Sequence, residues 1–384
     1  MVEKITADRK KKSGKKIFII LCLILLVMIL TLTQIPYQGI IQKKLKKAIE
    51  DHGIKVTSLN IESINNNTAT ISELELGDKP SLNITRIELA YRLQRLLTSG
   101  FDANTGINAD ATAIIVKSDP YTINADELKA DMQGNNGTWK GTVAIPKLDI
   151  KDLEQDIPTL TVNSEMKFDR EKLNADTVIN DKTKEYSAEI ISALLFNAPR
   201  SGNINIKHMQ FPWGGGRIYA DNVIISLAFD KPIKIGIHLE NVELADTLGK
   251  VSDKIKGDGK ISGVLPVIYY PDGTITLDDG VAAANSGGII NVSPTLMPGD
   301  NAQVAIARTA LENFHYTSLK ISVSSDKNNK SSINLAIEGK NPDAFGDRPV
   351  KLNVNLAGDI IPLIQQSLLP LEDFKKLMDI KETK

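Results

Sequence analysis

The chain has 384 residues, enough for one or two domains with a sizeable hydrophobic core. Its 46 lysine and arginine residues balance 47 aspartate and glutamate residues, so charge gives no reason to expect a nucleic-acid partner. The single cysteine, Cys22, excludes both an intrachain disulfide and a thiolate metal cluster.

The N-terminal segment predicts one transmembrane helix at residues 17–37. Seven basic residues come before it, and no charged residue occurs from 17 to 42. About 20 helical residues, rising ~1.5 Å each, cover the ~30 Å hydrocarbon core of a bilayer. The basic residues predict that residues 1–16 form a cytoplasmic tail and that the body lies across the membrane.

A cleaved signal peptide would share the basic start and the apolar core. No small-x-small cleavage site follows this core, however, and the apolar run is longer than a typical signal-peptide core. We therefore favour an uncleaved anchor. A helix is expected next, at residues 40–52, with Ile41, Leu45, Ala48 and Ile49 on one face. Its lysines would lie near anionic headgroups, or else form an ordinary solvated face.

The rest of the chain predicts a mainly β body, because apolar and polar residues alternate in many short runs. In two runs the apolar positions change phase, from 82–84 to 87–89 and from 143–145 to 148–150, which indicates β-bulges. Turns are expected where Asn, Asp, Gly and Pro gather between runs. The clearest runs are 223–229, 233–239, 261–269, 319–323, 333–337 and 350–356.

Few helices are expected, and all of them are short. They are predicted at 40–52, 86–98, 246–254, 302–312 and 358–378. Residues 86–98 also fit a strand. Pro370 should divide the last helix into two amphipathic pieces, which would either cap the final strand or dock on a membrane or a partner.

No catalytic or metal site is predicted, and we do not expect an enzyme or a cofactor. The four histidines, His52, His208, His238 and His315, share no metal-ligand spacing. There is no nucleophile elbow and no phosphate-binding loop motif. The glycines at 214–216 are expected in a turn rather than in an anion site.

The C-terminal part carries a family resemblance in several spaced runs. They are Gly257–Val267, Asp272–Gly273, Asp279–Ala283, Gly288–Ile290, Ala310–Leu319, Glu338–Pro342 and Arg348–Leu356. In this order they resemble the YdbH-like domain, also called the dicarboxylate transport domain. The anchor followed by residues 56–61 and 74–77 is similar to the start of AsmA-like proteins.

The resemblance implies an AsmA-like fold, in which one transmembrane helix is followed by an elongated, taco-shaped β-groove. Residues 38–200 would form the N-terminal part of this periplasmic groove. Residues 201–384 would form its YdbH-like part, with the terminal amphipathic helices. The protein would be a single-pass protein of the bacterial inner membrane. It would carry phospholipid toward the outer membrane, and a small outer-membrane lipoprotein of the YnbE type would continue its sheet.

A curled sheet with apolar inward side chains could shelter acyl chains, at ~25 cal/mol per Å² of apolar surface removed from water. Alternation alone also fits a sandwich of two sheets. A lipid conduit is the preferred function. A membrane-tethered assembly scaffold that binds proteins by strand addition is the alternative. The candidate groove residues are Val223, Ile225, Leu227, Phe229, Ile233, Ile235, Ile237, Leu239, Val350, Leu352, Val354 and Leu356.

Overall fold

The structure is a computed structural model, and some segments of the chain are not described in it. The described residues are 38–51, 54–78, 80–99, 103–118, 121–151, 156–195, 201–246, 254–297, 299, 301–325 and 331–356. The predicted anchor at 17–37, the predicted helix at 358–378 and nearly all of the predicted helix at 246–254 lie outside these residues. Within the described part, no helix has both the length and the apolar character needed to cross a membrane.

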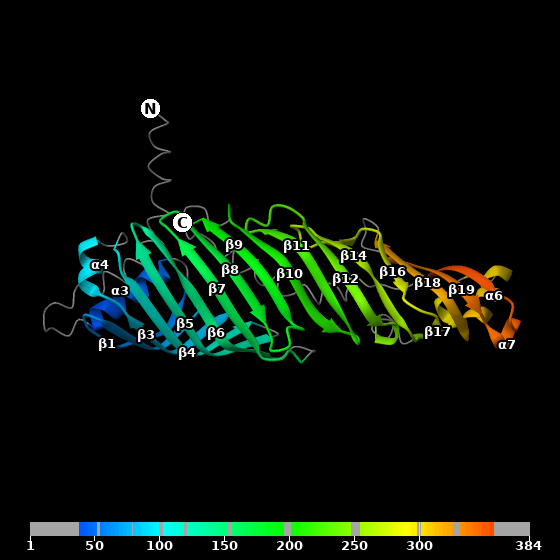
Figure 1. The fold of residues 1–384 in the computed structure, drawn as a ribbon, viewed down its shortest axis with the longest axis horizontal. Coiled ribbons are helices and arrows are strands. Elements are labelled where there is room, and N and C mark those ends of the chain that lie inside the picture. The colour runs from blue at the N-terminus through cyan, green and yellow to red at the C-terminus, as the bar shows by residue number, and fades with distance from the viewer. Residues whose placement is uncertain are drawn as a thin grey trace, which may run out of the picture. The chain divides into compact units, whose positions relative to one another are not determined.

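The described residues form two compact units. Residues up to Asn205, together with Ser226–Ala228, belong to unit 1. Ile206–Ile225 and the residues from Phe229 onward belong to unit 2. Both units are built mainly from antiparallel strands with a few short helices (Figure 1), so the predicted mainly β class is confirmed.

Unit 1 is an antiparallel meander in which each strand pairs with the next one along the chain. Short turns join the first strand to the second and the fifth to the sixth, as predicted, whereas a helix lies in the connection between the third and fourth strands. The turn between the fifth and sixth strands places Asn136 and Gly137 at φ 47° and 77°, the left-handed pair that a two-residue hairpin requires. The strands are β1 (Val56–Ile64), β2 (Thr68–Leu76), β3 (Ser81–Ala90), β4 (Gly106–Ser118), β5 (Tyr121–Asn135), β6 (Thr138–Lys151), β7 (Leu160–Phe168), β8 (Lys172–Asn180) and β9 (Ser187–Leu195).

Two helices belong to unit 1. Helix α3 (Gln38–Glu50) confirms the helix predicted at 40–52. The helix predicted at 86–98 is wrong over its first part, because residues up to Ala90 belong to β3 and only α4 (Leu93–Ser99) is helical. Strand β3 pairs with β2 on one side and β4 on the other. These two ladders satisfy the backbone hydrogen-bonding groups of β3. This pairing outweighs the local propensity of the segment to form a helix.

The bulge predicted at 143–150 is confirmed, whereas β3 has no bulge, because its ladders with β2 and β4 keep one register on both sides of Thr85. In β2 to β6 the inward positions skip two residues at the same level, as from Ile84 to Ile87 in β3. Glu73 in β2 and Ala113 in β4 take positive φ angles of 54° and 49° at this level. The β6–β7 ladder shifts register between Ile145 and Leu148. The phase slips in the sequence thus mark one line of irregular residues that crosses five neighbouring strands.

Unit 2 contains both long strands and strands of only three to five residues. The main ladder runs β11, β12, β14, β16, β18, β19, β20. Short strands β15, β16 and β17 follow one another between the two long strands β14 and β18, and β17 also pairs with β13. The strands are β10 (Asn203–Trp213), β11 (Gly216–Ser226), β12 (Ile233–Glu243), β13 (Ile255–Gly257), β14 (Lys260–Tyr269), β15 (Ile275–Leu277), β16 (Gly280–Ala284), β17 (Gly288–Val292), β18 (Phe314–Ser325), β19 (Ser331–Lys340) and β20 (Val350–Leu356).

The helices of unit 2 are η4 (Pro294–Leu296), α6 (Ala302–Leu311) and α7 (Pro342–Phe345). Helix α6 confirms the prediction at 302–312, and the Asn301 side chain caps it by accepting a hydrogen bond from the Val304 amide. The strand predicted at 223–229 starts and ends later than β11 does. Strand β11 ends at Ser226, and Phe229 has φ 49° in the connection to β12.

Candidate functional site: the apolar sheet face

In unit 2, apolar residues form an unbroken row across the main ladder. Directly paired positions link β12, β14, β16, β18, β19 and β20. Leu335 in the centre is 1% exposed. The row is Leu239, Gly263, Ala282, Ile321, Leu335 and Val354.

Small residues in the middle of this row let the strands come close together. A Cβ atom at Gly263 would lie 2.4 Å from the Ala282 Cα, so only glycine fits there. The sequence already places Gly263 in phase with Ile261 and Leu265. Sequence analysis did not name Ala282 as part of the apolar face, and its pairing with Gly263 is what identifies it.

Ten of the twelve candidate groove residues lie in β11, β12 and β20, and Leu227 and Phe229 follow the end of β11. Burial separates the two faces clearly in β11, where Ile225 is 8% exposed and Ile224 is 61% exposed, whereas the residues from Ile235 to His238 in β12 are all partly buried. Ile235, Ile237, Val350 and Leu352 are partly buried, and the Leu356 side chain lies outside the described residues. Whether these residues contact lipid stays a prediction. The buried ones are Val223, Ile225, Leu227, Phe229, Ile233, Leu239 and Val354.

Unit 1 carries a similar row across eight strands, from β2 to β9. It contains one polar pair, because Ser164 and Thr177 face each other and their hydroxyl oxygens lie 2.9 Å apart. Each hydroxyl satisfies the other, so the pair can remain on an otherwise apolar face. The row is Ala69, Leu89, Ala109, Ala130, Val143, Ser164, Thr177 and Ile190.

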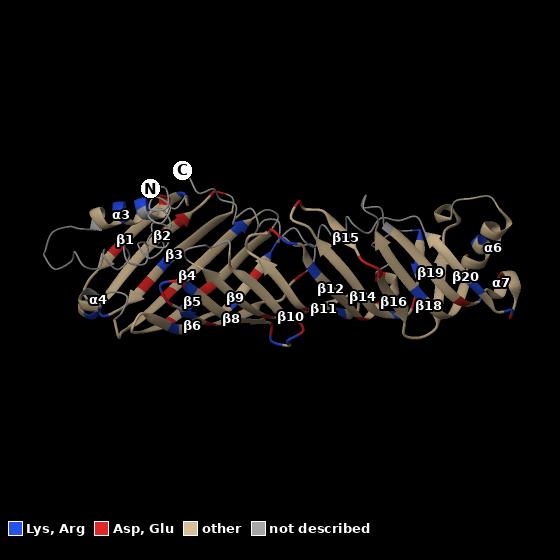
Figure 2. Ribbon diagram, turned by 90° about the horizontal axis from the view of Figure 1, so that it is seen from above, with Lys and Arg blue, Asp and Glu red and all other residues tan. Residues whose placement is uncertain are grey.

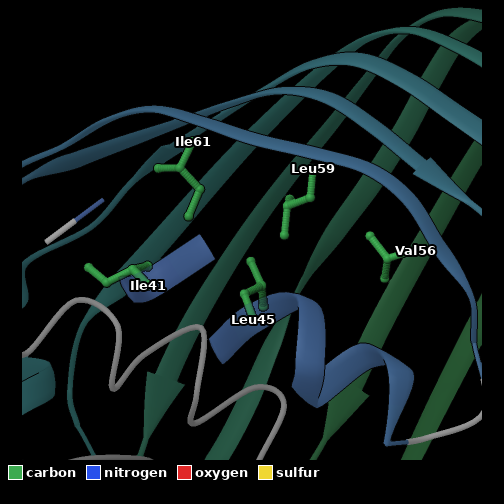
Figure 3. Close-up of a cluster of buried hydrophobic side chains, with 5 residues drawn as sticks. All are labelled: Ile41, Leu45, Val56, Leu59 and Ile61. Atoms are coloured by element: carbon green, nitrogen blue, oxygen red, sulfur yellow. The ribbon is translucent and has the colours of Figure 1, made fainter. Parts of the chain in front are cut away.

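Helix α3 covers the start of this face. Ile41 and Leu45 are 1% and 4% exposed, and they point toward Val56, Leu59 and Ile61 of β1 (Figure 3). The four lysines of the helix remain exposed, at positions 43, 44, 46 and 47. The apolar side of α3 therefore packs on the sheet, and its lysines lie on the exposed side, where Lys46 pairs with Glu50 at 3.8 Å.

A second cluster of buried residues lies where β2, β4 and β6 of unit 1 begin. Tyr91, Ala103 and Trp139 are buried together, and the Trp139 ring stacks on Phe168 with centroids 6.2 Å apart. Burial raises the pKa of the Tyr91 hydroxyl from 10.0 to about 12. This hydroxyl donates to the carbonyl oxygens of Asn65 and Thr68, at 2.7 and 3.1 Å. Tyr91 thereby fastens the β1–β2 turn to the core.

Charged residues lie mainly away from the apolar rows. Figure 2 shows both signs of charge scattered along the strands of each unit, so neither unit's strands carry charge of one sign alone. Among the described residues, Asp181 is the one buried carboxylate, and it closes the β8–β9 turn. Burial alone would raise the pKa of Asp181, but hydrogen bonds from Thr183 and Tyr186 hold it below its usual value.

The histidines do not come together as a metal site. The Nδ1 atom of His208 lies 2.6 Å from the Oδ1 atom of Asp221. The His238 ring stacks on the Tyr219 ring, with ring centroids 4.6 Å apart. Within the described segments, no group of three or more His, Cys, Asp or Glu side chains is placed to hold a metal ion. His52 lies outside these segments. The glycines at 214–216 lie in the β10–β11 connection and at the start of β11, as expected for a turn.

One comparison with known families identifies part of the chain. Residues 188–369 match the family model described as "YdbH-like: Intermembrane phospholipid transport protein YdbH". This segment is YdbH-like. The YdbH-like segment includes most of β9 and every strand from β10 to β20, and the apolar row of unit 2 therefore lies inside it. The resemblance inferred from the spaced sequence runs is confirmed for these residues. No curated protein and no solved structure matches the chain.

Proposed function

We propose that the chain is a membrane-anchored lipid conduit, in which phospholipid acyl chains lie along the apolar sheet faces. Residues 17–37 would anchor it in the inner membrane, with the body in the periplasm. The YdbH-like match points to intermembrane phospholipid transport. The unbroken apolar row across six strands of the YdbH-like segment is the observation that carries the proposed mechanism.

The arrangement of strands favours a conduit over an ordinary sandwich. In a sandwich, the apolar face of one sheet is covered by a second sheet. The described strands of unit 1 instead form one continuous meander and supply no second sheet to cover its face. A lipid tail placed on such a face would gain ~25 cal/mol for each Å² of apolar surface that leaves water.

Adjacent positions on β11 give a matched test of the conduit. A photo-reactive phenylalanine at Ile225 should capture phospholipid in cells, whereas the same group at Ile224 should not, because the two side chains point to opposite faces. Lipid would be identified by mass spectrometry of the crosslinked protein. Equal capture at both positions would show that the apolar face is not the lipid path.

The anchor is tested separately. The basic residues before residue 17 favour a cytoplasmic N-terminus, so a reporter fused after Lys384 should be active only outside the cytoplasm. Finding the mature N-terminus near residue 38 would show that the apolar segment is a signal peptide instead.

Strand addition is the second candidate function, and the last described strand favours it. Strand β20 pairs with β19 over seven residue pairs, and its other edge contacts no further strand of the described residues to a comparable extent. Such an edge can accept a strand from a partner. We propose that a small outer-membrane lipoprotein of the YnbE type binds there. A crosslinker at Asn355 of β20 should then capture it, whereas one at Lys167 of β7 should not.

A further inference from the structure

The polar face of unit 1 carries a cleft that the proposed lipid path does not use. It has a volume of about 890 Å³ and lies where β2, β3, β4 and β5 reach one edge of the sheet, beside α4. Asn108 and Gln133 line it, and each follows a residue of the apolar cluster, Ile107 or Met132. Because side chains alternate along a strand, the cleft opens on the opposite face from the apolar row.

The walls of the cleft are held in place by the chain itself. Tyr91 fixes the β1–β2 turn through its hydroxyl, and its amide donates to the Asn67 carbonyl at 2.8 Å. On the far side, the Gly134 amide donates to the Thr105 carbonyl, also at 2.8 Å. A ligand would therefore meet a surface that is formed before it binds, which lowers the entropy lost on binding.

Two arginines give the cleft its charge. The lining contains Arg92 and Arg95 and no acidic side chain. Arg95 donates to the Asn104 carbonyl at 2.8 Å, which fixes its position. Arg92 lies between β3 and α4 and has no hydrogen bond or ion pair with the described residues, whereas Arg86 of β3 pairs with Glu62.

Neutral polar groups complete the lining. Asn67, Asn108, Gln133 and Asn135 supply amide donors and acceptors.

We infer that this cleft binds a phosphate ester that also carries free hydroxyl groups. Guanidinium groups match phosphate oxygens in geometry and charge, and side-chain amides match hydroxyl groups. The volume lies within the usual range for small-molecule sites. The phosphate ester could be a soluble compound or the headgroup of a lipid. The inference does not rest on the lipid conduit, because the cleft and the apolar row lie on opposite faces of the sheet.

The test measures binding of sn-glycerol 3-phosphate to the full chain in phosphatidylcholine bilayers by equilibrium dialysis. We expect saturable binding, with inorganic phosphate competing and neutral glycerol failing to compete. R92A should weaken binding about tenfold or more, as expected for a lost charged hydrogen bond. R86A is the matched control, because it removes an arginine of the same sheet outside the cleft, and it should change affinity by less than about twofold.

A second measurement separates binding from folding. Arg92 makes no hydrogen bond or ion pair with the described residues, so R92A should weaken binding without lowering the melting temperature of the ligand-free protein. Repeating the dialysis in bilayers that contain phosphatidylglycerol identifies the source of the ligand. Competition by this lipid would assign the cleft to headgroups, and its absence would assign the cleft to soluble phosphate esters. A wild-type chain without saturable binding, or equal losses in R92A and R86A, would overturn the inference.

Discussion

Replacing Tyr91 by phenylalanine should destabilise unit 1 at neutral pH and should change how its stability depends on alkaline pH. The Tyr91 side chain is 4% exposed, and its hydroxyl donates to two carbonyl oxygens of the β1–β2 segment. Phenylalanine keeps the ring in the core but removes this donor from the Asn65 carbonyl, while the Thr68 carbonyl still accepts from the Asn65 amide at 2.9 Å. The variant should therefore lose about 1 to 2 kcal/mol of unfolding free energy at pH 8.

The pH dependence follows from the raised pKa. The Tyr91 hydroxyl ionises near pH 10.0 in the unfolded chain and near pH 12 in the folded one, because burial disfavours the phenolate. Between these values the unfolded state binds fewer protons than the folded state. Stability then falls with rising pH, by up to about 1.4 kcal/mol per pH unit for one proton. The contribution of the neutral Tyr91 hydroxyl to the unfolding free energy is complete below pH 10 and is lost toward pH 12. The phenylalanine variant has no hydroxyl proton to lose, so this part of its pH dependence is absent.

Urea denaturation at pH values from about 8 to 11.5 measures both effects. A Trp213→Phe background leaves Trp139 as the single tryptophan, and it lies in the same cluster as Tyr91, so its fluorescence reports on unit 1. The advantage of the wild type over the variant should shrink as pH rises above 10, by about 2 kcal/mol in total. An advantage that stays constant over this range would refute the reasoning.

Three further predictions concern packing and buried polar groups. Leu45→Ala should cost about 2 to 4 kcal/mol in chemical denaturation because Leu45 is 4% exposed against β1, whereas the exposed Lys46→Ala should stay within about 0.5 kcal/mol. Ser164→Ala should cost about 1 kcal/mol because it leaves the Thr177 hydroxyl without its partner, and adding Thr177→Val should recover most of the loss; simple additivity would contradict this. Asn341→Ala should cost about 3 kcal/mol or more, because this side chain is 2% exposed and makes four hydrogen bonds; a loss below about 1 kcal/mol would contradict it.

Features that depend on neighbouring residues could be predicted from the sequence. The alternation around Ile225 and Leu335 identified the buried face, because each strand has one apolar side whatever its partner is. The phase change between Ile145 and Leu148 identified a bulge for the same reason. These signals are local, and no knowledge of the pairing order is needed to find them.

Features that depend on distant residues could not be predicted. Strand β14 pairs with β12 rather than with β13, its predecessor, and no local pattern marks this choice. The apolar side of α3 could have faced a membrane, and only the fold shows Leu45 against β1. The cleft that contains Arg92 was also missed, because its lining residues come from separate turns and strands. The arginines and the Asn and Gln residues among them are, each taken alone, ordinary exposed polar residues.

The meander of unit 1 has a consequence for how the chain reaches its folded state. Each strand from β2 to β9 pairs with the strand made just before it, so every new hairpin can add to a finished edge with a short loop closure. Folding can then follow synthesis or export from the N-terminus, much as repeat arrays grow from one end. Unit 2 cannot grow in this simple order, because β13 must wait for β17 to emerge. The slow step in maturation should therefore fall in unit 2, after the first unit has already formed.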